Sequence, residues 1–363
     1  MGKKLKYGII GCGGIARGKY LPSIHNLPDV EIAALCDMQP DRAAEAGREY
    51  AGGGAKVFAD YRELLREDLD AVCVCTPNNS HSEVTVAALK SGKNVMCEKP
   101  MAVSTAEAKA MIAARDESGK LLTIGYQNRF REDSLFLKAE CEKGTLGEIY
   151  FARATALRRR AVPTWGVFLD AEKQGGGPLI DIGTHALDLT LFMMNNYEPQ
   201  YAVGTVYHKL NKDKNTGNAW GDWDTKAFTA EDSAFGFVVM KNGATIILES
   251  SWALNITGEK ESVTTLCGTK GGAEMPKPGE LVLNGVKNGR PYSLTPLLQS
   301  AGVMFYSGNE EKDTDREART FRNAILGKGK LCVLPEEALV VTMILEGIYK
   351  SAATGKPSYF NGE

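Results

Sequence analysis

Short apolar runs alternate with helical segments over roughly the first 125 residues of the chain. The run at 30–36 is almost entirely apolar, and segments such as 84–89 carry Val, Ala and Leu between these runs. Such alternation is typical of a parallel β-sheet whose two faces are covered by helices. We therefore predict strands near residues 5–10, 30–36, 71–75, 94–97 and 121–125.

The pattern changes near residue 130, where a helical segment at about 132–143 precedes longer runs of alternating polar and apolar residues. That alternation is typical of strands with one buried face and one solvated or partner-covered face, and so of a largely antiparallel sheet. We predict these strands near 148–158, 200–208, 233–240, 244–253 and 262–267.

Two further segments stand out in this second part. Residues 209–231 form a polar stretch that contains Trp220 and Trp223, and loops of this length are usually functional or disordered. The two tryptophans favour function over disorder. Near the end, residues 335–353 are apolar enough for a helix that packs back toward the first domain.

The segment 7–16 places an apolar strand, a glycine turn and a helix start next to one another. Gly11 permits a tight turn, Gly13 allows the backbone to approach a pyrophosphate, and the small Ala16 allows the helix to pack closely. Gly14 and Ile15 begin that helix, whose first N–H groups would hold the phosphates. This spacing predicts a dinucleotide site.

An acidic residue, Asp37, ends the second predicted strand. Its carboxylate would accept hydrogen bonds from the adenosine ribose and repel a 2′-phosphate, which favours NAD over NADP. The alternative is an ordinary turn acid after a buried strand. We expect an α/β protein with a Rossmann domain at 1–127 and an α+β domain, built on a large open sheet, at 128–363.

Polar residues follow three further strands of the first domain. In an open α/β sheet the ligand lies beyond the carboxyl ends of the strands, so these residues are candidates for contacts to the cofactor. Pro100 favours an extended Lys99, which would keep the lysine at the crevice. The candidates are Thr76, Pro77, Asn78 and His81, then Glu98 and Lys99, and finally Gln127.

A second cluster of polar residues lies within the apolar segment 175–192. Three glycines and Pro178 precede it, as is typical of a helix start. At 100° per residue, Asp181, His185 and Asp188 fall within roughly a 60° arc of one helix face. Buried carboxylates beside an imidazole indicate either a hydrogen-bonded packing network or an active site in which a carboxylate orients a basic histidine.

Composition limits the remaining possibilities. The formal net charge of −2 gives no reason to expect a nucleic-acid or anionic-membrane partner. No apolar run approaches the ~20 residues of a membrane span, and we expect a cytoplasmic protein. The eight cysteines lack disulfide-scaffold spacing, and the four histidines do not cluster, so we expect no metal site.

Three motifs together resemble the glucose-fructose oxidoreductase/inositol dehydrogenase/MocA family. They are the glycine turn at 11–16, the Glu-Lys-Pro sequence at 98–100 and the Asp-Ile-Gly-Thr-His-Ala-Leu-Asp sequence at 181–188. The resemblance extends through nearly the whole chain. It implies an NAD-dependent enzyme in which Lys99 and His185 flank the substrate carbon opposite the nicotinamide.

In such an enzyme a hydride passes between a secondary alcohol of a sugar, polyol or glycoside and the nicotinamide. We expect His185 to act as general base, held by Asp181, with Lys99 stabilising charge on the alcohol oxygen. Proton relay through Lys99 is the rival mechanism. The candidate substrate contacts are Arg129, Arg160, Trp165, Asp181, His185 and Asp188.

The segment 158–166 is similar to enzymes of the family that oxidise C3 of a glycoside's sugar. The alternatives are an inositol dehydrogenase, an enzyme that retains NAD and cleaves a glycoside by oxidation and elimination, and a non-catalytic NAD-binding sensor. The partner we expect is a small carbohydrate, and we expect a homo-oligomer (dimer, tetramer or hexamer) assembled through the C-terminal sheet.

Overall fold

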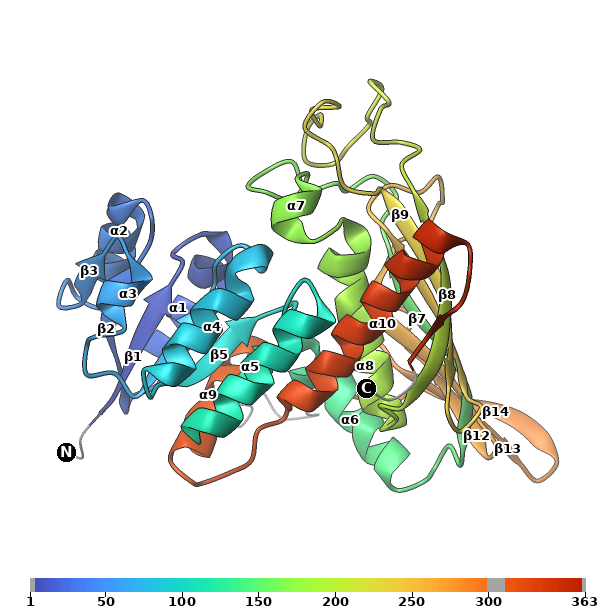
Figure 1. The fold of residues 1–363 in the computed structure, drawn as a ribbon. Helices are drawn as coiled ribbons and strands as arrows, with labels where there is room; N and C mark the ends of the chain where they lie inside the picture. The colour runs from blue at the N-terminus through green and yellow to red at the C-terminus, as the bar shows by residue number, and fades with distance from the viewer. Residues whose placement is uncertain (1–3, 299–310, 361–363) are drawn as a thin grey trace. The chain divides into compact units, whose positions relative to one another are not determined.

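The computed structural model describes residues 4–298 and 311–360 (Figure 1). Residues 299–310 and 361–363, which belong to the predicted second domain, lie outside the described part. The chain forms two compact units. Unit 1 holds the chain as far as Gln127 together with Glu311–Leu339, and unit 2 holds the remainder. The return of 311–339 to unit 1 differs from the predicted division, which assigned everything after residue 127 to one domain.

Unit 1 is built on a parallel sheet of six strands in the order β3-β2-β1-β4-β5-β6. This order is that of a Rossmann fold, whose ligand crevice lies where the order reverses, between β1 and β4. The five predicted strands are present, and the unpredicted β3 is a short, largely exposed strand with little apolar signal. The strands are β1 (Leu5–Ile10), β2 (Val30–Cys36), β3 (Lys56–Phe58), β4 (Ala71–Val74), β5 (Asn94–Glu98) and β6 (Leu122–Gly125).

Helices flank this sheet, and their ends follow simple chemistry. Helix α5 begins where the Ser104 hydroxyl accepts a bond from the Glu107 N–H (3.3 Å) and ends at Gly119, whose φ is +62°. Helix α9 belongs to the returning segment and buries Phe321 against Tyr7. The helices of unit 1 include η1 (Ala16–Tyr20), α1 (Leu21–His25), α2 (Pro40–Tyr50), α3 (Tyr61–Leu64), η2 (Asn78–Ser80), α4 (His81–Lys90), α5 (Thr105–Ser118) and α9 (Asp313–Ile325).

Unit 2 contains a nine-stranded sheet in the order β14-β13-β12-β11-β7-β10-β9-β8-β15. Its neighbouring strands are antiparallel except for β7 and β10, which run parallel, so the predicted mostly antiparallel sheet is confirmed. The strands are β7 (Ile149–Leu157), β8 (Pro199–Tyr207), β9 (Ser233–Met240), β10 (Thr245–Ser251), β11 (Lys260–Gly268), β12 (Gly271–Glu274), β13 (Val282–Lys287), β14 (Arg290–Leu294) and β15 (Ser358–Tyr359).

The last four strands were not predicted, because they lack the apolar alternation of the others. Strand β12 is the glycine-rich Gly271–Glu274, and every residue of β14 is exposed. Backbone pairing to the neighbouring strands β11 and β13 fixes β12 and β14, and this pairing leaves no apolar pattern in the sequence. Strand β15 pairs with β8, which lies far earlier in the chain.

Helices cover one face of the unit 2 sheet. The apolar helix α8 (Thr184–Met194) is buried along nearly its whole length. Helix α10 (Pro335–Thr354) runs beside β8 (Figure 1), with its Ile348 side chain against Gly204 and Gly236 on paired strands. The other helical segments of unit 2 are η3 (Gln127–Phe130, shared with unit 1 at its first residue), α6 (Glu132–Glu142), α7 (Ala171–Gln174) and η4 (Leu179–Gly183).

The polar stretch 209–231 contains neither helix nor strand. Asp232 anchors its start, because its carboxylate accepts bonds from the backbone N–H groups of Leu210 (2.6 Å) and Asn211 (3.2 Å). Trp223 is buried, whereas Trp220 is exposed. The stretch is therefore an ordered loop with its own small core.

Gly204 gives a test of this packing. A Cβ at Gly204 would lie 2.5 Å from Ile348 Cγ2 and 3.0 Å from the backbone carbonyl oxygen of Phe235. We expect Gly204→Ala to lower the free energy of unfolding by about 1–3 kcal/mol, measured by urea denaturation. Gly258→Ala is the control, because a Cβ there meets nothing within 4 Å. In an Ile348→Ala background, Gly204→Ala should lower the free energy of unfolding by less. An equal decrease there would contradict the assigned contact.

Candidate active site

The glycine turn lies at the carboxyl end of β1, beside the end of β4. Gly11 has a φ of +91°, and a Cβ there would lie 2.5 Å from the carbonyl oxygen of Cys75. The Gly11 N–H donates to the Cys36 carbonyl at 2.8 Å. The chain itself therefore requires glycine at this position, both for its backbone angle and for its close approach to the segment after β4.

Gly13 and Gly14 differ from Gly11. Neither has a positive φ, and a Cβ built on either would meet no described atom within 4 Å. The described chain gives no packing reason for glycine there, whereas a pyrophosphate approaching the backbone does. Behind them Ala16 is fully buried, as close packing of the helix requires. These residues fit a dinucleotide.

Asp37 ends β2 and is tied to the same turn. Its carboxylate accepts bonds from the backbone N–H groups of Cys12 (2.9 Å) and Gln39 (2.8 Å). These bonds orient the carboxylate at the edge where a ribose would lie. Ile15, beside the turn, is exposed at the start of the helix.

The loop after β4 is tied to the turn after β5 by His81. One ring nitrogen lies 2.7 Å from the Pro100 carbonyl and the other 2.9 Å from the Thr76 carbonyl. His81 is fully buried, and burial lowers its pKa. This histidine therefore joins the Thr76-Pro77-Asn78 and Glu98-Lys99-Pro100 segments, and the same loop holds Asn78 buried.

A buried ammonium, Lys19, links the ends of β5 and β6. Its Nζ lies 2.7 Å from a Glu98 carboxylate oxygen and 2.9 Å from one of Glu317 in α9. It also donates to the Gln127 side chain at 3.3 Å. The other Glu98 oxygen accepts a bond from the Lys99 N–H at 2.8 Å. Glu98 thus holds the backbone that carries Lys99.

Sequence reasoning missed Lys19 and Glu317. A signal was present for Lys19, because it follows Ala16 by three residues on the helix face that packs against the sheet. No local signal existed for Glu317, whose partner is nearly the whole chain away.

The two carboxylates on Lys19 have pKa values shifted in opposite directions. Burial acts to raise both values. For Glu98 the nearby charges of Lys19 and Lys99 prevail, and its pKa is lowered. For Glu317 burial prevails over Lys19, and its pKa is raised to about 7. Lys19 itself has a raised pKa, since the two carboxylates outweigh its burial. Glu98 is therefore the ionised partner of Lys19, and Glu317 is the carboxyl that takes up a proton first.

In unit 2, the glycine run and Pro178 lead into a π-helical turn, η4, before α8. Glu231 fixes this turn by accepting bonds from the N–H groups of Gly177 (2.6 Å) and Leu179 (3.2 Å). The Tyr349 hydroxyl of α10 donates to the same carboxylate at 2.7 Å. A π-turn advances less per residue than an α-helix, so the predicted 60° arc, which assumed uniform α geometry, does not apply.

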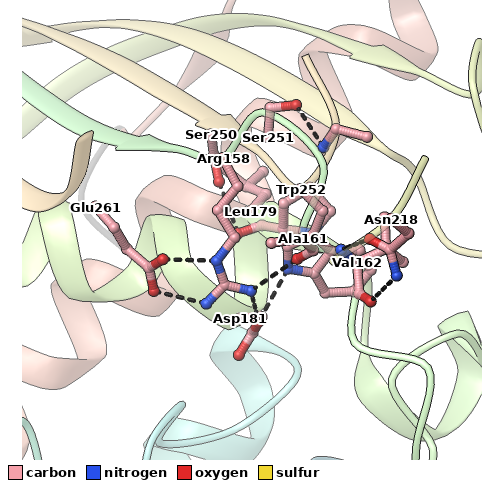
Figure 2. Close-up of polar contacts among 12 residues, drawn as sticks. Arg158, Ala161, Val162, Leu179, Asp181, Asn218, Ser250, Ser251, Trp252 and Glu261 are labelled. Atoms are coloured by element: carbon pink, nitrogen blue, oxygen red, sulfur yellow. Dashed lines mark hydrogen bonds and ion pairs between the residues drawn. The ribbon is translucent and has the colours of Figure 1, made fainter. Parts of the chain in front are cut away.

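Asp181 lies in this π-turn within a polar cluster (Figure 2). Trp252 donates its ring N–H to the carboxylate at 2.9 Å, and Arg158 lies 3.9 Å from it. Two bonds of 2.6 Å join Arg158 to the carboxylate of Glu261. The cluster holds Asp181 in a set orientation four residues before His185, whose side chain is nearly buried.

Asp188 points to a different partner. Its carboxylate accepts bonds from Arg129 at 2.6 and 3.0 Å, and both side chains are fully buried. Arg129 also lies over the Phe192 ring, 4.6 Å from its centroid. The predicted single stripe is therefore divided, with Asp181 facing Trp252 and Arg158 while Asp188 pairs with Arg129.

The remaining predicted contacts lie apart from these pairs. Arg160 donates to the Asn255 side chain at 2.8 Å, and it is Arg158 that approaches Asp181. Trp165 lies on the following loop with about half of its surface exposed. Lys99 belongs to unit 1, and Asp181 and His185 belong to unit 2.

Known proteins share both parts of this arrangement. The profile of an oxidoreductase family with an NAD-binding Rossmann fold matches residues 5–126, and that of the GFO/IDH/MocA C-terminal domain matches residues 135–274. The chain belongs to the GFO/IDH/MocA family. This GFO/IDH/MocA protein is an oxidoreductase that binds NAD, as its resemblance predicted.

Two curated relatives are informative. The chain is 35% identical over 355 residues to D-glucoside 3-dehydrogenase of Escherichia coli (strain K12), with 97% of this chain and 96% of the relative covered. It is 29% identical over 258 residues to myo-inositol 2-dehydrogenase of Thermotoga maritima, with 70% and 73% covered. Levoglucosan dehydrogenase in complex with NADH and levoglucosan shares the fold, with a TM-score of 0.82, 21% identity and 99% and 100% coverage.

The described residues contain no group of three or more His, Cys, Asp or Glu side chains suited to a metal ion. Across the same residues, no helix has the length and apolar character needed to cross a membrane. The cysteines at 12, 36, 73, 75 and 97 are buried and free.

The two kinds of glycine in the turn give a paired test. Gly13→Ala should leave the thermal unfolding temperature unchanged and weaken NAD binding about tenfold or more, because its Cβ would enter only the space for phosphate. Gly11→Ala should instead lower stability by several kcal/mol, because its Cβ would overlap the Cys75 carbonyl. Calorimetric titration and thermal melts measure both. Normal NAD affinity in Gly13→Ala would refute the phosphate assignment.

Glu317 gives a pH test. Because its folded-state pKa is raised from 4.5 to about 7, the folded state gains stability from the proton below that range and loses it as pH rises through it. Glu317→Gln should remove this loss, so its stability relative to the native protein should rise by on the order of 1–3 kcal/mol between about pH 4.5 and pH 7.

Urea denaturation across that pH range measures the effect. Glu336→Gln is the control, since Glu336 forms an exposed pair with Arg115 and should leave the pH profile unchanged. Parallel pH profiles for native protein and Glu317→Gln would contradict the assignment of the raised pKa.

Proposed function

We propose that this GFO/IDH/MocA protein oxidises a secondary hydroxyl of a sugar or glycoside, specifically the C3 hydroxyl of a glucoside-like ring. The observation that carries the proposal is the similarity to D-glucoside 3-dehydrogenase over nearly the full length of both chains. The buried His185, one helical turn after the fixed Asp181, supports it, because alcohol oxidation needs a positioned proton acceptor.

The reaction breaks the C3–H bond and the O–H bond of the hydroxyl on C3, and a C3=O double bond forms. Bound NAD supplies the acceptor for the hydride. His185 takes the hydroxyl proton, and the carboxylate of Asp181 stabilises the imidazolium that results. The Lys99 ammonium stabilises the negative charge that develops on the oxygen, and in the rival mechanism Lys99 itself relays the proton.

Other residues position these groups or the sugar. Arg129 and Asp188 satisfy each other in the interior, so we assign them to holding η3 and α8 in place rather than to direct contact with substrate. Arg160 and Trp165, which retain accessible surface, stay as candidate contacts. Asp37 selects NAD by bonding to ribose and repelling a 2′-phosphate.

Substrate profiling tests the proposal. Methyl glucoside, glucose and myo-inositol are each supplied with NAD, and NADH formation is followed by absorbance while products are analysed for a 3-keto sugar. A 3-keto product with stoichiometric NADH is expected. Oxidation of myo-inositol alone would favour an inositol dehydrogenase, and glycoside cleavage without NADH would favour the oxidation–elimination mechanism.

We also propose that the uncovered face of the unit 2 sheet joins copies of the chain. On this face Val203 and Phe237 are paired neighbours, 39% and 43% exposed, and Ile247 lies next to Phe237. Exposed apolar rows of this kind are typical of protein interfaces. Light scattering at micromolar concentration should give a dimer, tetramer or hexamer, and Phe237→Asp should shift it toward monomer. A native monomer would contradict the proposal.

The two proton-transfer mechanisms give different variant behaviour. If His185 is the base, His185→Ala should lower kcat by roughly 10²–10⁴ and lose the acid limb of the pH–rate profile, because imidazolium cannot accept a proton. Lys99→Ala should lower kcat yet keep that limb, with NAD binding intact. His25→Ala is the control, because its exposed ring at the end of α1 contacts the Tyr50 carbonyl and has no proposed catalytic role. Loss of the limb in Lys99→Ala alone would make Lys99 the base.

A further inference from the structure

A series of aromatic rings extends from Asp181 to the protein surface in unit 2. Trp252 donates to Asp181, Phe168 lies edge-on to Trp252 at 6.4 Å between centroids, and Trp165 lies edge-on to Phe168 at 5.9 Å. Trp220 completes the series, with its ring centroid 5.0 Å from that of Trp165. The outer end is accessible, because Trp165 is 52% exposed and Trp220 43% exposed.

The two exposed tryptophans belong to two loops that are joined by hydrogen bonds. The Asn218 side chain pairs with both the N–H and the carbonyl of Val162, at 2.8 and 3.0 Å (Figure 2). The Thr164 hydroxyl donates to the Trp220 carbonyl at 2.8 Å. The indole pair is therefore preorganised, and a ligand that stacks on it would not have to order the loops.

The two tryptophans pack on each other, on Phe168 and on Arg158, yet about half of each side chain stays exposed. Tryptophan is highly buried on average, and aromatic surface presented beside a site usually contacts a ligand. The charged side chain next to the tryptophan pair, Arg158, already has a carboxylate partner. Arg158 lies 5.1 Å from the Trp220 ring centroid and is bonded to Glu261. The surface therefore selects an apolar face rather than an anion.

We propose that Trp165 and Trp220 form a subsite for the group attached to the anomeric oxygen of a glycoside, which stacks on them through a flat apolar face. The inference rests on the proposed function, which places the oxidised ring at Asp181 and His185. Because Trp252 and Phe168 join the outer pair to Asp181, we place the attached group on the outer pair. An aromatic ring or the C–H face of a second sugar would both supply the required surface.

The test compares glycosides that differ only in that group. The kcat/KM values for methyl glucoside, phenyl glucoside and methyl cellobioside, in both anomeric forms where available, are measured for native protein, Trp165→Ala and Trp220→Ala. Trp165→Phe keeps a ring at the same position. Phe136→Ala is the matched control, because Phe136 is an exposed aromatic residue on α6 of the same unit.

We expect each alanine variant to lose roughly 3- to 10-fold in kcat/KM on phenyl glucoside, which is the range that one stacking contact supplies. The loss should come from a higher KM. Trp220→Ala should leave the value for methyl glucoside unchanged, which also shows that this variant folds. Thermal unfolding checks that Trp165→Ala folds. Trp165→Phe should retain most of the native value, and Phe136→Ala all of it. A matching loss on methyl cellobioside would extend the subsite to a second sugar.

Equal losses on methyl and phenyl glucosides, or no loss on either, would overturn the subsite. If the native protein oxidises none of these compounds, the proposed function fails. The subsite is then tested by tryptophan fluorescence, where a change with phenyl glucoside that is absent with methyl glucoside and in Trp165→Ala supports it, and no change overturns it.

Discussion

The need to neutralise charge in the interior is the constraint on which both halves of this protein depend. An unpaired ion in a protein interior costs several kcal/mol, so each buried charge has to be held by partners of opposite sign. In unit 1 that requirement fixes Lys19 between Glu98 and Glu317. In unit 2 it pairs Arg129 with Asp188 and Arg158 with Glu261. The elements that carry the chemistry are held where these pairs form.

Buried polar contacts of this kind also explain the positions of the proposed catalytic groups. One carboxylate oxygen of Glu98 accepts a bond from the Lys19 ammonium, and the other accepts a bond from the backbone N–H of Lys99. The buried pair of Glu98 and Lys19 therefore orients the segment that carries Lys99. Asp181 is held by the Trp252 ring N–H within a π-turn, which is itself fastened by Glu231 and Tyr349. In each unit, a proposed catalytic residue is positioned by residues to which no catalytic role is assigned.

The sequence predicted features that depend on local pattern. The glycine turn, the parallel strands and the antiparallel sheet follow from residues adjacent in the chain, and the structure contains them. It did not predict features that depend on distant partners. Strand β15 is specified by pairing with β8, far earlier in the chain. The π-turn at Leu179–Gly183 shifts Asp181 away from the direction that uniform helix geometry gave. Lys19 and Glu317 could not be joined without knowing that 311–339 returns to unit 1.

That return has a consequence for synthesis. The N-terminus leaves the ribosome first, and N-terminal domains usually fold first. Here the sheet of unit 1 and the pair of Lys19 with Glu98 emerge early, whereas α9, with Glu317 and Phe321, follows only after most of unit 2 has been made. Until then, the surface of β1 and η1 that α9 covers has no partner. The apolar surface that Phe321 covers beside Tyr7 therefore stays exposed until the last part of the chain has been made.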